Sequence, residues 1–198
     1  MNIQQSAHNK LDRHHAIVIG GSMAGLLAAR VLSDHFQHVT IIERDYLTND
    51  TEPRKGVPQG RHGHALLAQG GLILRDLFPD LFPALARDGA VPLNISDICR
   101  YQLGVWMAPL PTPAKTLVQS RPFLEQHVRT SLAARDNVHI IDVCEVIKLY
   151  EDRGHIMGVH LRYRTGGPHE EILFANLVVD ASGRGSRAPQ WLESLGYG

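Results

Sequence analysis

The stretch that decides the fold is residues 16–45, AIVIGGSMAGLLAARVLSDHFQHVTIIERD. Its first four residues are apolar and mostly β-branched, and they run into Gly20 and Gly21, which predicts a buried strand entering a tight turn. Apolar residues then recur at helical spacing from residue 24 to about residue 35, and residues 39–42 predict a second buried strand. A strand, a glycine turn, a helix and a strand form a βαβ unit, whose crossover makes the two strands parallel and adjacent.

The turn carries a dinucleotide-binding pattern. Gly20, Ser22 and Gly25 occupy the three positions of a G-x-G-x-x-G fingerprint, with serine in the middle. The context supports the motif, because it follows a strand, opens a helix and precedes an acidic residue, Glu43, at the end of the next strand. The helix N-terminus offers N–H groups to a pyrophosphate. We therefore expect the turn residues to contact a cofactor: Gly20, Gly21, Ser22, Met23, Ala24 and Gly25.

The acidic residue narrows the choice of cofactor. Glu43 is placed to bind the two ribose hydroxyls of an adenosine, and its charge would repel a 2′-phosphate. FAD or NAD is therefore favoured over NADP at this position. Ser22 must either be displaced slightly from the pyrophosphate or donate its hydroxyl to a phosphate oxygen. The alternative is a strand, turn and helix that bind no nucleotide.

The rest of the chain adds further elements of an α/β fold. Between the βαβ unit and residue 134 we expect a polar loop over 45–62, a helix over 65–77, short turns at Pro79 and Pro83, one strand over 99–107, a strand over 116–119 and a helix over 122–134. Beyond it we expect a strand over 138–143, a three-stranded antiparallel meander over 146–150, 156–163 and 171–175, and a last buried strand over 177–179. The residues after Gly183 predict neither a strand nor a helix.

Composition excludes several classes of protein. Among 198 residues, 43% are hydrophobic and 20 Lys+Arg balance 20 Asp+Glu, so nothing indicates nucleic acid or a membrane surface as a partner. The N-terminus has no apolar signal region, and no apolar run reaches the roughly 20 residues that span a bilayer. Cys99 and Cys144 suit free thiols in a reducing compartment, and the 12 His lack metal-site spacing. We expect a cytoplasmic protein without a metal site.

The N-terminal stretch resembles the FAD-binding segment of the flavoprotein monooxygenases of the p-hydroxybenzoate hydroxylase and squalene epoxidase type. The sequence Glu-Arg-Asp after the second strand is typical of that group, as is an arginine in the following loop. The resemblance therefore implies roles in cofactor binding for Arg44 and Arg54. Both are equally explained, from the residues alone, as solvated loop charges.

Two later segments continue the resemblance. Residues 120–134, SRPFLEQHVRTSLAA, are similar to the family's R-x-x-L-x-x-x-L helix, whose arginine contacts the flavin nucleotide. Arg121 fits that position best and Arg129 is the second choice, and both face one side of a helix. Residues 140–152, IIDVCEVIKLYED, resemble the adenine-side strand, which implies a backbone contact near Cys144 or Glu145.

The last strand leads into LVVDASGRGSRAPQWL, residues 177–192, where the family carries a second fingerprint that is usually Asp-Gly. Aligned on Ser186, Ser182 and Gly183 take that place, and Asp180 lies two residues earlier. The resemblance implies a glutathione-reductase-type FAD domain with an antiparallel meander, FAD as the tightly held cofactor and NAD(P)H as co-substrate. In such enzymes one oxygen atom of O2 passes to an aromatic or alkene substrate.

Other features have weaker interpretations. Residues 56–70, GVPQGRHGHALLAQG, resemble a segment of bacterial polyether epoxidases, and His62 or His64 beside a flavin would tune its charge. Solvated residues around a helix start are the favoured explanation, because single histidines are common in such loops. Trp106, Met107 and Trp191 are expected in core or lid packing rather than in a substrate site.

One expected feature is absent from the sequence. The family carries a third fingerprint, a Gly-Asp pair, and no Gly-Asp dipeptide occurs in the 198 residues. We therefore expect a disordered tail over 1–14 and an incomplete FAD-binding domain over 15–198, interleaved at about 60–120 with the start of a substrate-domain sheet. Its missing C-terminal portion, or a partner chain, would complete an enzyme acting on a small molecule. The alternatives are a non-catalytic nucleotide-binding module and an NAD-dependent reductase.

Overall fold

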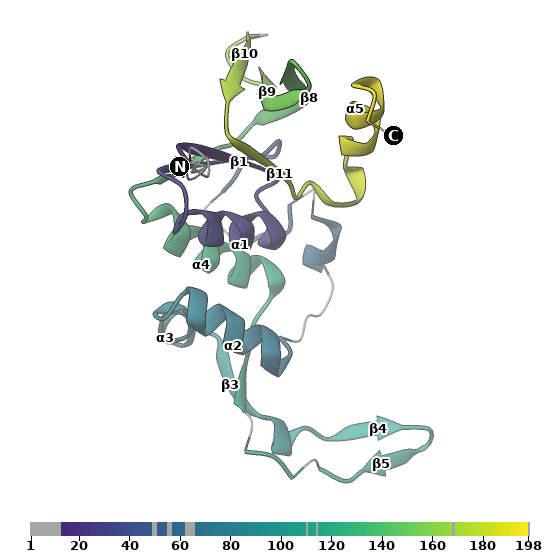
Figure 1. Ribbon diagram of the computed structural model, residues 1–198. Coiled ribbons are helices and arrows are strands. Elements are labelled where there is room, and N and C mark those ends of the chain that lie inside the picture. The colour runs from purple at the N-terminus through teal and green to yellow at the C-terminus, as the bar shows by residue number, and fades with distance from the viewer. Residues whose placement is uncertain are drawn as a thin grey trace, which may run out of the picture. The chain divides into compact units, whose positions relative to one another are not determined.

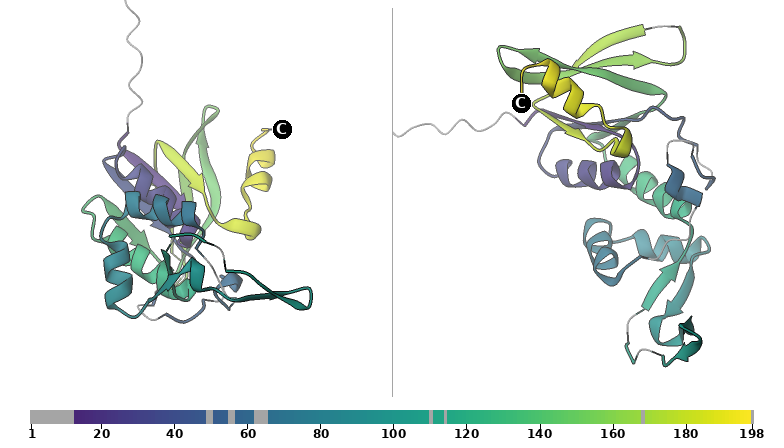
Figure 2. Two further views of the ribbon diagram at one scale, coloured as in Figure 1. Left: turned by 90° about the horizontal axis from the view of Figure 1, so that it is seen from below. Right: turned by 90° about the vertical axis from the view of Figure 1, so that its right-hand side faces the viewer.

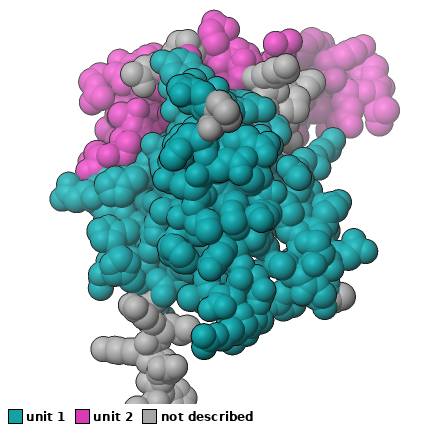
Figure 3. Space-filling view, turned by 90° about the horizontal axis from the view of Figure 1, so that it is seen from above, with its two compact units in different colours: residues 1–47, 135–198 teal, residues 48–134 magenta. Residues whose placement is uncertain are grey.

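The computed structural model describes residues 13–48, 51–54, 57–61, 66–109, 111–113, 115–167 and 169–197. These residues belong to two compact units (Figure 3). Unit 1 comprises Met1–Leu47 and Arg135–Gly198, and unit 2 comprises Thr48–Ala134. Unit 1 thus contains the predicted βαβ segment together with the C-terminal third of the chain.

A four-stranded parallel sheet forms the centre of unit 1 (Figure 1). Its strands, in spatial order, are β11 (Leu177–Asp180), β1 (His15–Ile19), β2 (His38–Ile42) and β7 (Val138–Ile141). Residues 16–18 are fully buried, as expected for a parallel strand that is covered on both faces. Helix α1 (Met23–Leu32) connects β1 to β2, so the predicted βαβ unit is confirmed.

An antiparallel meander packs on this sheet (Figure 2). It consists of β8 (Cys144–Asp152), β9 (His155–Tyr163) and β10 (His169–Phe174), with β9 in the middle. The turn between β8 and β9 is Arg153-Gly154, and both residues have positive φ, at 52° and 79°, as a tight hairpin turn requires. Apolar meander residues share one core with residues of β1 and β2, which confirms the predicted meander and its place in the domain.

The C-terminal end of unit 1 corrects one expectation. Helix α5 (Ala188–Ser194) forms where the sequence predicts neither a helix nor a strand. Pro189 lies in the first turn of α5, where its missing N–H is tolerated. Trp191 is 8% exposed and packs in the core with the meander, as expected of it. A helix of seven residues is too short to show a clear apolar period.

The start of unit 1 lies partly in the segment predicted as a tail. Residues 1–12 lie outside the described residues. Arg13 and His14, also assigned to the tail, accept backbone hydrogen bonds from Gln37 and His38 at 3.0 and 2.9 Å. These two residues therefore extend the pairing between β1 and β2.

The described residues of unit 2 form three helices and two small antiparallel ladders. Its elements are the 3-10 turn η1 (Pro58–Arg61), α2 (Ala68–Leu77), α3 (Leu81–Arg87), β3 (Val91–Asn94), the 3-10 turn η2 (Ile95–Asp97), β4 (Arg100–Gln102), β5 (Val105–Met107), β6 (Lys115–Val118) and α4 (Arg121–Ala133). β3 pairs with β6, and β4 pairs with β5. Pro83 lies in the first turn of α3, so the turns expected around it are instead a helix.

The β4–β5 hairpin corrects a second expectation, since residues 99–107 were predicted as a single strand. The chain reverses at Leu103-Gly104, with φ values of 54° and 82°. Tyr101 and Trp106 face each other across the hairpin with ring centroids 5.2 Å apart, and they are 63% and 71% exposed. The core alternative is therefore wrong for Trp106 and for Met107, which is 44% exposed, and packing as part of a lid stays a prediction.

The two cysteines have different surroundings. Cys99 is exposed in unit 2, whereas Cys144 is buried at the start of β8, and both are free thiols. Burial, with a smaller effect from the nearby carboxylates, raises the pKa of Cys144 to about 11. Cys144 therefore acts as a small apolar core residue rather than as a reactive thiol.

The close approach of α1 to the glycine turn limits the residue at position 25. A Cβ atom there would lie 1.8 Å from the carbonyl oxygen of Gly20, which is a backbone atom and cannot move aside. By contrast, a Cβ at Gly71 in α2 would lie 3.8 Å from the Phe82 ring, an ordinary contact distance. The structure therefore requires glycine at position 25, whereas it has room for a larger residue at position 71.

We expect Gly25→Ala to lower the free energy of unfolding by more than about 3 kcal/mol, because the helix must move away from the turn. The same change at Gly71 should raise stability by up to about 1 kcal/mol, because alanine is the better helix former. Urea unfolding followed by circular dichroism measures both. Equal effects of the two substitutions would contradict the close packing at Gly25.

His15 links the sheet to the meander. Its Nδ1 lies 2.7 Å from the carbonyl oxygen of Phe174, and its Nε2 lies 2.9 Å from the hydroxyl of Thr40. Burial lowers the pKa of His15, the Phe174 carbonyl opposes this, and the neighbouring histidines lower the pKa further. In the pH range just below 6.5 the folded chain therefore holds fewer protons than the unfolded chain.

We expect the stability of the chain to fall as the pH is lowered from 7.5 to 5.5. The loss follows because protonation of His15 is disfavoured in the folded chain, where burial lowers its pKa. Thermal unfolding across this pH range measures the effect. His15→Gln removes the titrating group and should flatten the profile, and an unchanged pH dependence in that variant would contradict this role of His15.

Candidate functional site

The glycine turn in unit 1 is fixed by the two strands beside it. Gly20 has φ +105°, a conformation that L side chains rarely adopt, and a Cβ there would lie 2.7 Å from the carbonyl oxygen of Ala181. Its N–H donates to the carbonyl of Ile42 at 2.8 Å. The turn thus lies at the carboxyl ends of β1, β2 and β11, where ligands bind in open α/β sheets.

The N-terminus of α1 follows directly after this turn. Ser22 is the N-cap residue, with extended backbone angles of φ −94° and ψ −176°. The first turn of α1 contains Met23, Ala24 and Gly25 and no acidic residue, so the positive end of the helix dipole is not offset from within the helix. This arrangement suits a pyrophosphate.

Glu43 joins the end of β2 to the glycine turn. It is 7% exposed, and its Oε2 accepts a hydrogen bond from the Gly21 N–H at 2.7 Å. Its Oε1 accepts from the Asp45 N–H at 2.9 Å. A carboxylate offers about four acceptor positions, so bonds to two backbone donors are compatible with bonds to ribose hydroxyls. The structure thus brings the predicted acid and the predicted turn together.

Two other predicted residues of unit 1 lie near this edge of the sheet. Arg44 is exposed, and its Nη1 lies 3.9 Å from the place where a Cβ at Gly185 would stand. Glu145 is the second residue of β8, and its carboxylate lies 3.9 Å from Arg164 and 3.8 Å from Arg187. The Glu145 side chain therefore pairs with arginines of the same unit, and its expected cofactor contact is through the backbone.

Asp180, whose role the sequence leaves open, organises the loop that follows β11. Its Oδ1 accepts from the backbone N–H and the hydroxyl of Ser182 at 2.9 and 2.5 Å, and its Oδ2 accepts from the Ser186 hydroxyl. Burial acts to raise the pKa of Asp180, but these hydrogen bonds outweigh it and lower the pKa. Asp180 is thus an ionised carboxylate that holds the loop beside the glycine turn.

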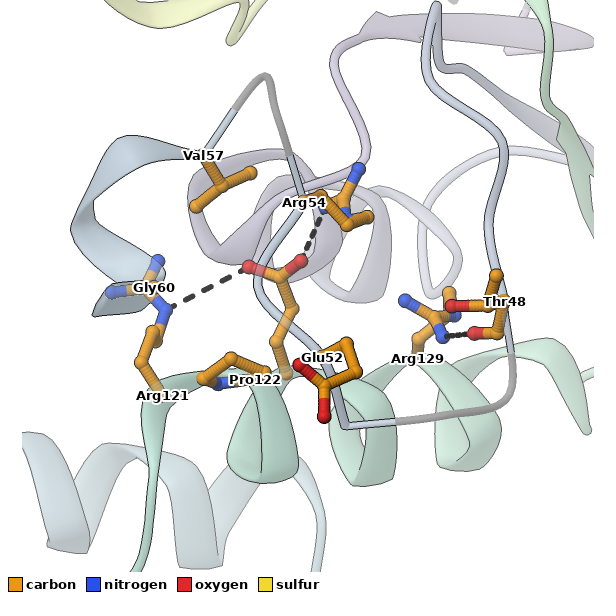
Figure 4. Close-up of a pocket in the computed structure, with 9 residues that line it drawn as sticks. Thr48, Glu52, Arg54, Val57, Gly60, Arg121, Pro122 and Arg129 are labelled. Atoms are coloured by element: carbon orange, nitrogen blue, oxygen red, sulfur yellow. Dashed lines mark hydrogen bonds and ion pairs between the residues drawn. The ribbon is translucent and has the colours of Figure 1, made fainter.

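In unit 2, the predicted arginines line one pocket (Figure 4). The pocket is lined by Thr48, Glu52, Arg54, Val57, Gly60, Arg121, Pro122, Glu125 and Arg129. Arg121 and Arg129 come from α4, two turns apart on one face, as the spacing predicts. Arg54 comes from the loop segment 51–54. Three guanidinium groups in one pocket can bind a phosphate or another anion.

The sequence analysis missed the acid among these arginines. Glu125 is 4% exposed, and it hydrogen-bonds Arg54 while its Oε2 lies 3.7 Å from Arg121 Nε. Arg129 is 9% exposed and donates to the carbonyl of Thr48. The i, i+4 spacing from Arg121 was a signal for an ion pair, but only the fold brings Arg54 to the same carboxylate.

The remaining candidates add no further site. His62 and His64 lie outside the described residues, and Arg61 is exposed. Within the described ranges no cluster of three or more His, Cys, Asp or Glu side chains could hold a metal ion. A search of the same ranges found no helix with the length and apolar character needed to cross a bilayer.

Comparison of the sequence with known proteins finds a relative that is longer than this chain. No protein-family model matches the chain. It is 40% identical over 196 residues to Protein Rv3254 of Mycobacterium tuberculosis, an alignment that includes 93% of this chain and 41% of the relative. The chain therefore spans less than half of the length of this relative.

Comparison of the structure finds flavin-dependent enzymes. The myxobacterial chondrochloren halogenase CndH, a FAD-dependent halogenase, matches with a TM-score of 0.66 and 20% identity over 88% of this chain and 38% of that enzyme. The flavin-dependent monooxygenase PieE, solved in complex with FAD and substrate, matches with a TM-score of 0.64 and 20% identity over 93% of this chain and 32% of that enzyme. The chain therefore has the FAD-binding Rossmann-type fold that forms part of these flavin-dependent enzymes.

Proposed function

We propose that the chain binds FAD and is the cofactor-binding part of a flavin-dependent oxidoreductase of the monooxygenase type. The observation that carries this proposal is the bond from the Gly21 N–H to the buried Glu43 carboxylate, at the N-terminus of α1. This hydrogen bond connects the glycine turn and the N-terminus of α1, which suit a pyrophosphate, to the Glu43 carboxylate, which suits a ribose.

The residues of unit 1 fit an adenine dinucleotide. The absence of side chains at Gly20 and Gly21 lets a phosphate approach the backbone closely, and the amides at the start of α1 face it. In our proposal Gly20, Gly21, Ser22, Met23, Ala24 and Gly25 bind the pyrophosphate. Glu43 accepts from the ribose hydroxyls, which disfavours a 2′-phosphate by charge repulsion. Arg44 and the Glu145 backbone are proposed contacts on the adenosine side.

The arginine pocket of unit 2 has a proposed role of its own. Arg54, Arg121 and Arg129 present planar, permanently charged groups that bind phosphate oxygens through paired N–H donors. We assign to these three arginines a role in binding the negatively charged phosphate oxygens of the cofactor. The likeness of the segment around Arg121 to the R-x-x-L-x-x-x-L helix supports that assignment.

When bound, FAD would supply the redox chemistry, accepting electrons from NAD(P)H and enabling transfer of an oxygen atom from O2 to an organic substrate. The residues of this chain bind and orient it. An aromatic or alkene substrate, NAD(P)H as reductant and an epoxidase-like activity are parts of the proposal, supported by the resemblance. A cytoplasmic location is also part of it, supported by the two free cysteines, which suit a reducing compartment.

A further portion of polypeptide is also part of the proposal. The β4–β5 hairpin exposes Tyr101, Leu103, Val105 and Trp106, with exposed fractions from 56% to 94%. Two-stranded ladders are only marginally stable alone, and large apolar patches usually mark contact surfaces. The relative is also more than twice as long as the aligned part. We propose that additional polypeptide, in the same chain or in a partner, covers this hairpin.

Titration of the 198-residue chain with FAD tests the cofactor assignment. We expect saturable quenching of flavin fluorescence that ADP-ribose relieves by competition. Glu43→Gln should weaken FAD binding by roughly tenfold or more, because hydrogen bonds to an ionised group contribute about 1.5–3 kcal/mol. Glu193→Gln is the matched control, an exposed glutamate on α5 with the same change of charge, and should bind FAD as the wild type does.

Different outcomes separate the alternatives. Saturable binding of NADH without binding of FAD would favour an NAD-dependent reductase and would overturn the proposal. FAD that binds but is not reduced by NADH or NADPH, even when the remaining polypeptide is supplied, would favour a non-catalytic nucleotide-binding module.

A further inference from the structure

The pocket of unit 2 contains a buried acid that neither the resemblance nor the comparisons assign. Glu125 is 4% exposed, and carboxylates are almost never this buried unless they are paired. Its two oxygens are divided between two arginines, Oε1 facing Arg54 and Oε2 facing Arg121 at 3.7 Å. One carboxylate thus connects a loop residue to the first residue of α4.

The positions of the arginines explain why such an acid is needed. Arg121 is the first residue of α4, at the positive end of the helix dipole, where a cation is electrostatically disfavoured. Arg54 lies in a loop without regular secondary structure, so its own backbone does little to fix the long side chain. Arg129 and the exposed Glu52 also line the pocket, so three arginines and a second acid lie around Glu125. A carboxylate between Arg54 and Arg121 offsets their repulsion.

We propose that Glu125 is a positioning residue, which holds the Arg54 and Arg121 guanidinium groups in the orientation that binds an anionic group of the cofactor. This inference rests on the proposed function, because it names how the arginine pocket is prepared for FAD. Arg129 provides an internal comparison, since it is held by the Thr48 carbonyl.

Glu125→Gln distinguishes positioning from a simple effect of charge. The variant keeps the shape of the side chain and makes the pocket more positive, so an effect of charge alone would tighten the binding of anionic FAD. Loss of positioning would instead weaken the binding of FAD, and we expect the affinity to fall by about tenfold. Flavin fluorescence titration measures the dissociation constant. Asp76→Asn, which removes an exposed charge from α2 of the same unit, should leave it unchanged.

A double-mutant cycle tests whether Glu125 acts through its partner. Arg54→Ala should weaken FAD binding by itself, and Glu125→Gln should then add much less than it costs in the wild-type background. Glu125→Asp keeps the charge and should restore part of the lost affinity. Fully additive effects of the two substitutions, or binding by Glu125→Gln that is equal to or tighter than wild type, would overturn the inference.

A second measurement decides the role of Glu125 without FAD. In ¹⁵N NMR spectra of the chain alone, we expect distinct Nε–H resonances for Arg54 and Arg121 that move to solvent-like positions in Glu125→Gln. The Arg129 resonance should not move. If wild-type protein fails to bind FAD, the proposed function fails, whereas the inference about Glu125 fails only if the Arg54 and Arg121 resonances are the same in both proteins.

Discussion

The contact between Gly25 and the carbonyl of Gly20 is the constraint on which the rest of unit 1 depends. A side chain at position 25 would lie 1.8 Å from that oxygen, so α1 lies against the turn only because no Cβ is present. This approach aims the N-terminus of α1 at the carboxyl edge of the sheet. Glu43, which follows β2, accepts a hydrogen bond from the Gly21 N–H of the turn. This hydrogen bond sets the distance between the N-terminus of α1 and the Glu43 carboxylate.

Two buried glutamates illustrate different ways to provide hydrogen-bond donors for a carboxylate inside a protein. Glu43 is bonded by backbone N–H groups of Gly21 and Asp45, which are neutral and leave the charge of the site negative. Glu125 is paired with arginine side chains, in a pocket that also contains Arg129 and the acid Glu52, so the arginines outnumber the acids there by three to two. The first arrangement suits ribose hydroxyls and the second suits phosphate.

The parts of the fold that could be predicted are those with a strong local period. The buried strands β1 and β2, the glycine turn and the meander follow from runs of β-branched residues and from Gly-containing turns. The β4–β5 hairpin and α5 were missed because three-residue strands and a seven-residue helix are too short for periodicity to distinguish. Trp106 was expected in core or lid packing, and the sequence did not show that the fold leaves it exposed, because composition says nothing about which apolar residues stay at the surface.

The sequence alone determined the βαβ unit and its likeness to flavoproteins. Glycine spacing and an acid at a strand end are local features, which can be read from residues close together in the sequence. The same holds for Arg121 and Arg129, which one helix places on one face. Only the tertiary structure decided that Glu125 lies between Arg54 and Arg121, and that Asp180 holds its loop through two serines. Such pairings depend on how the chain folds back on itself, and no local pattern encodes a contact between residues 71 positions apart.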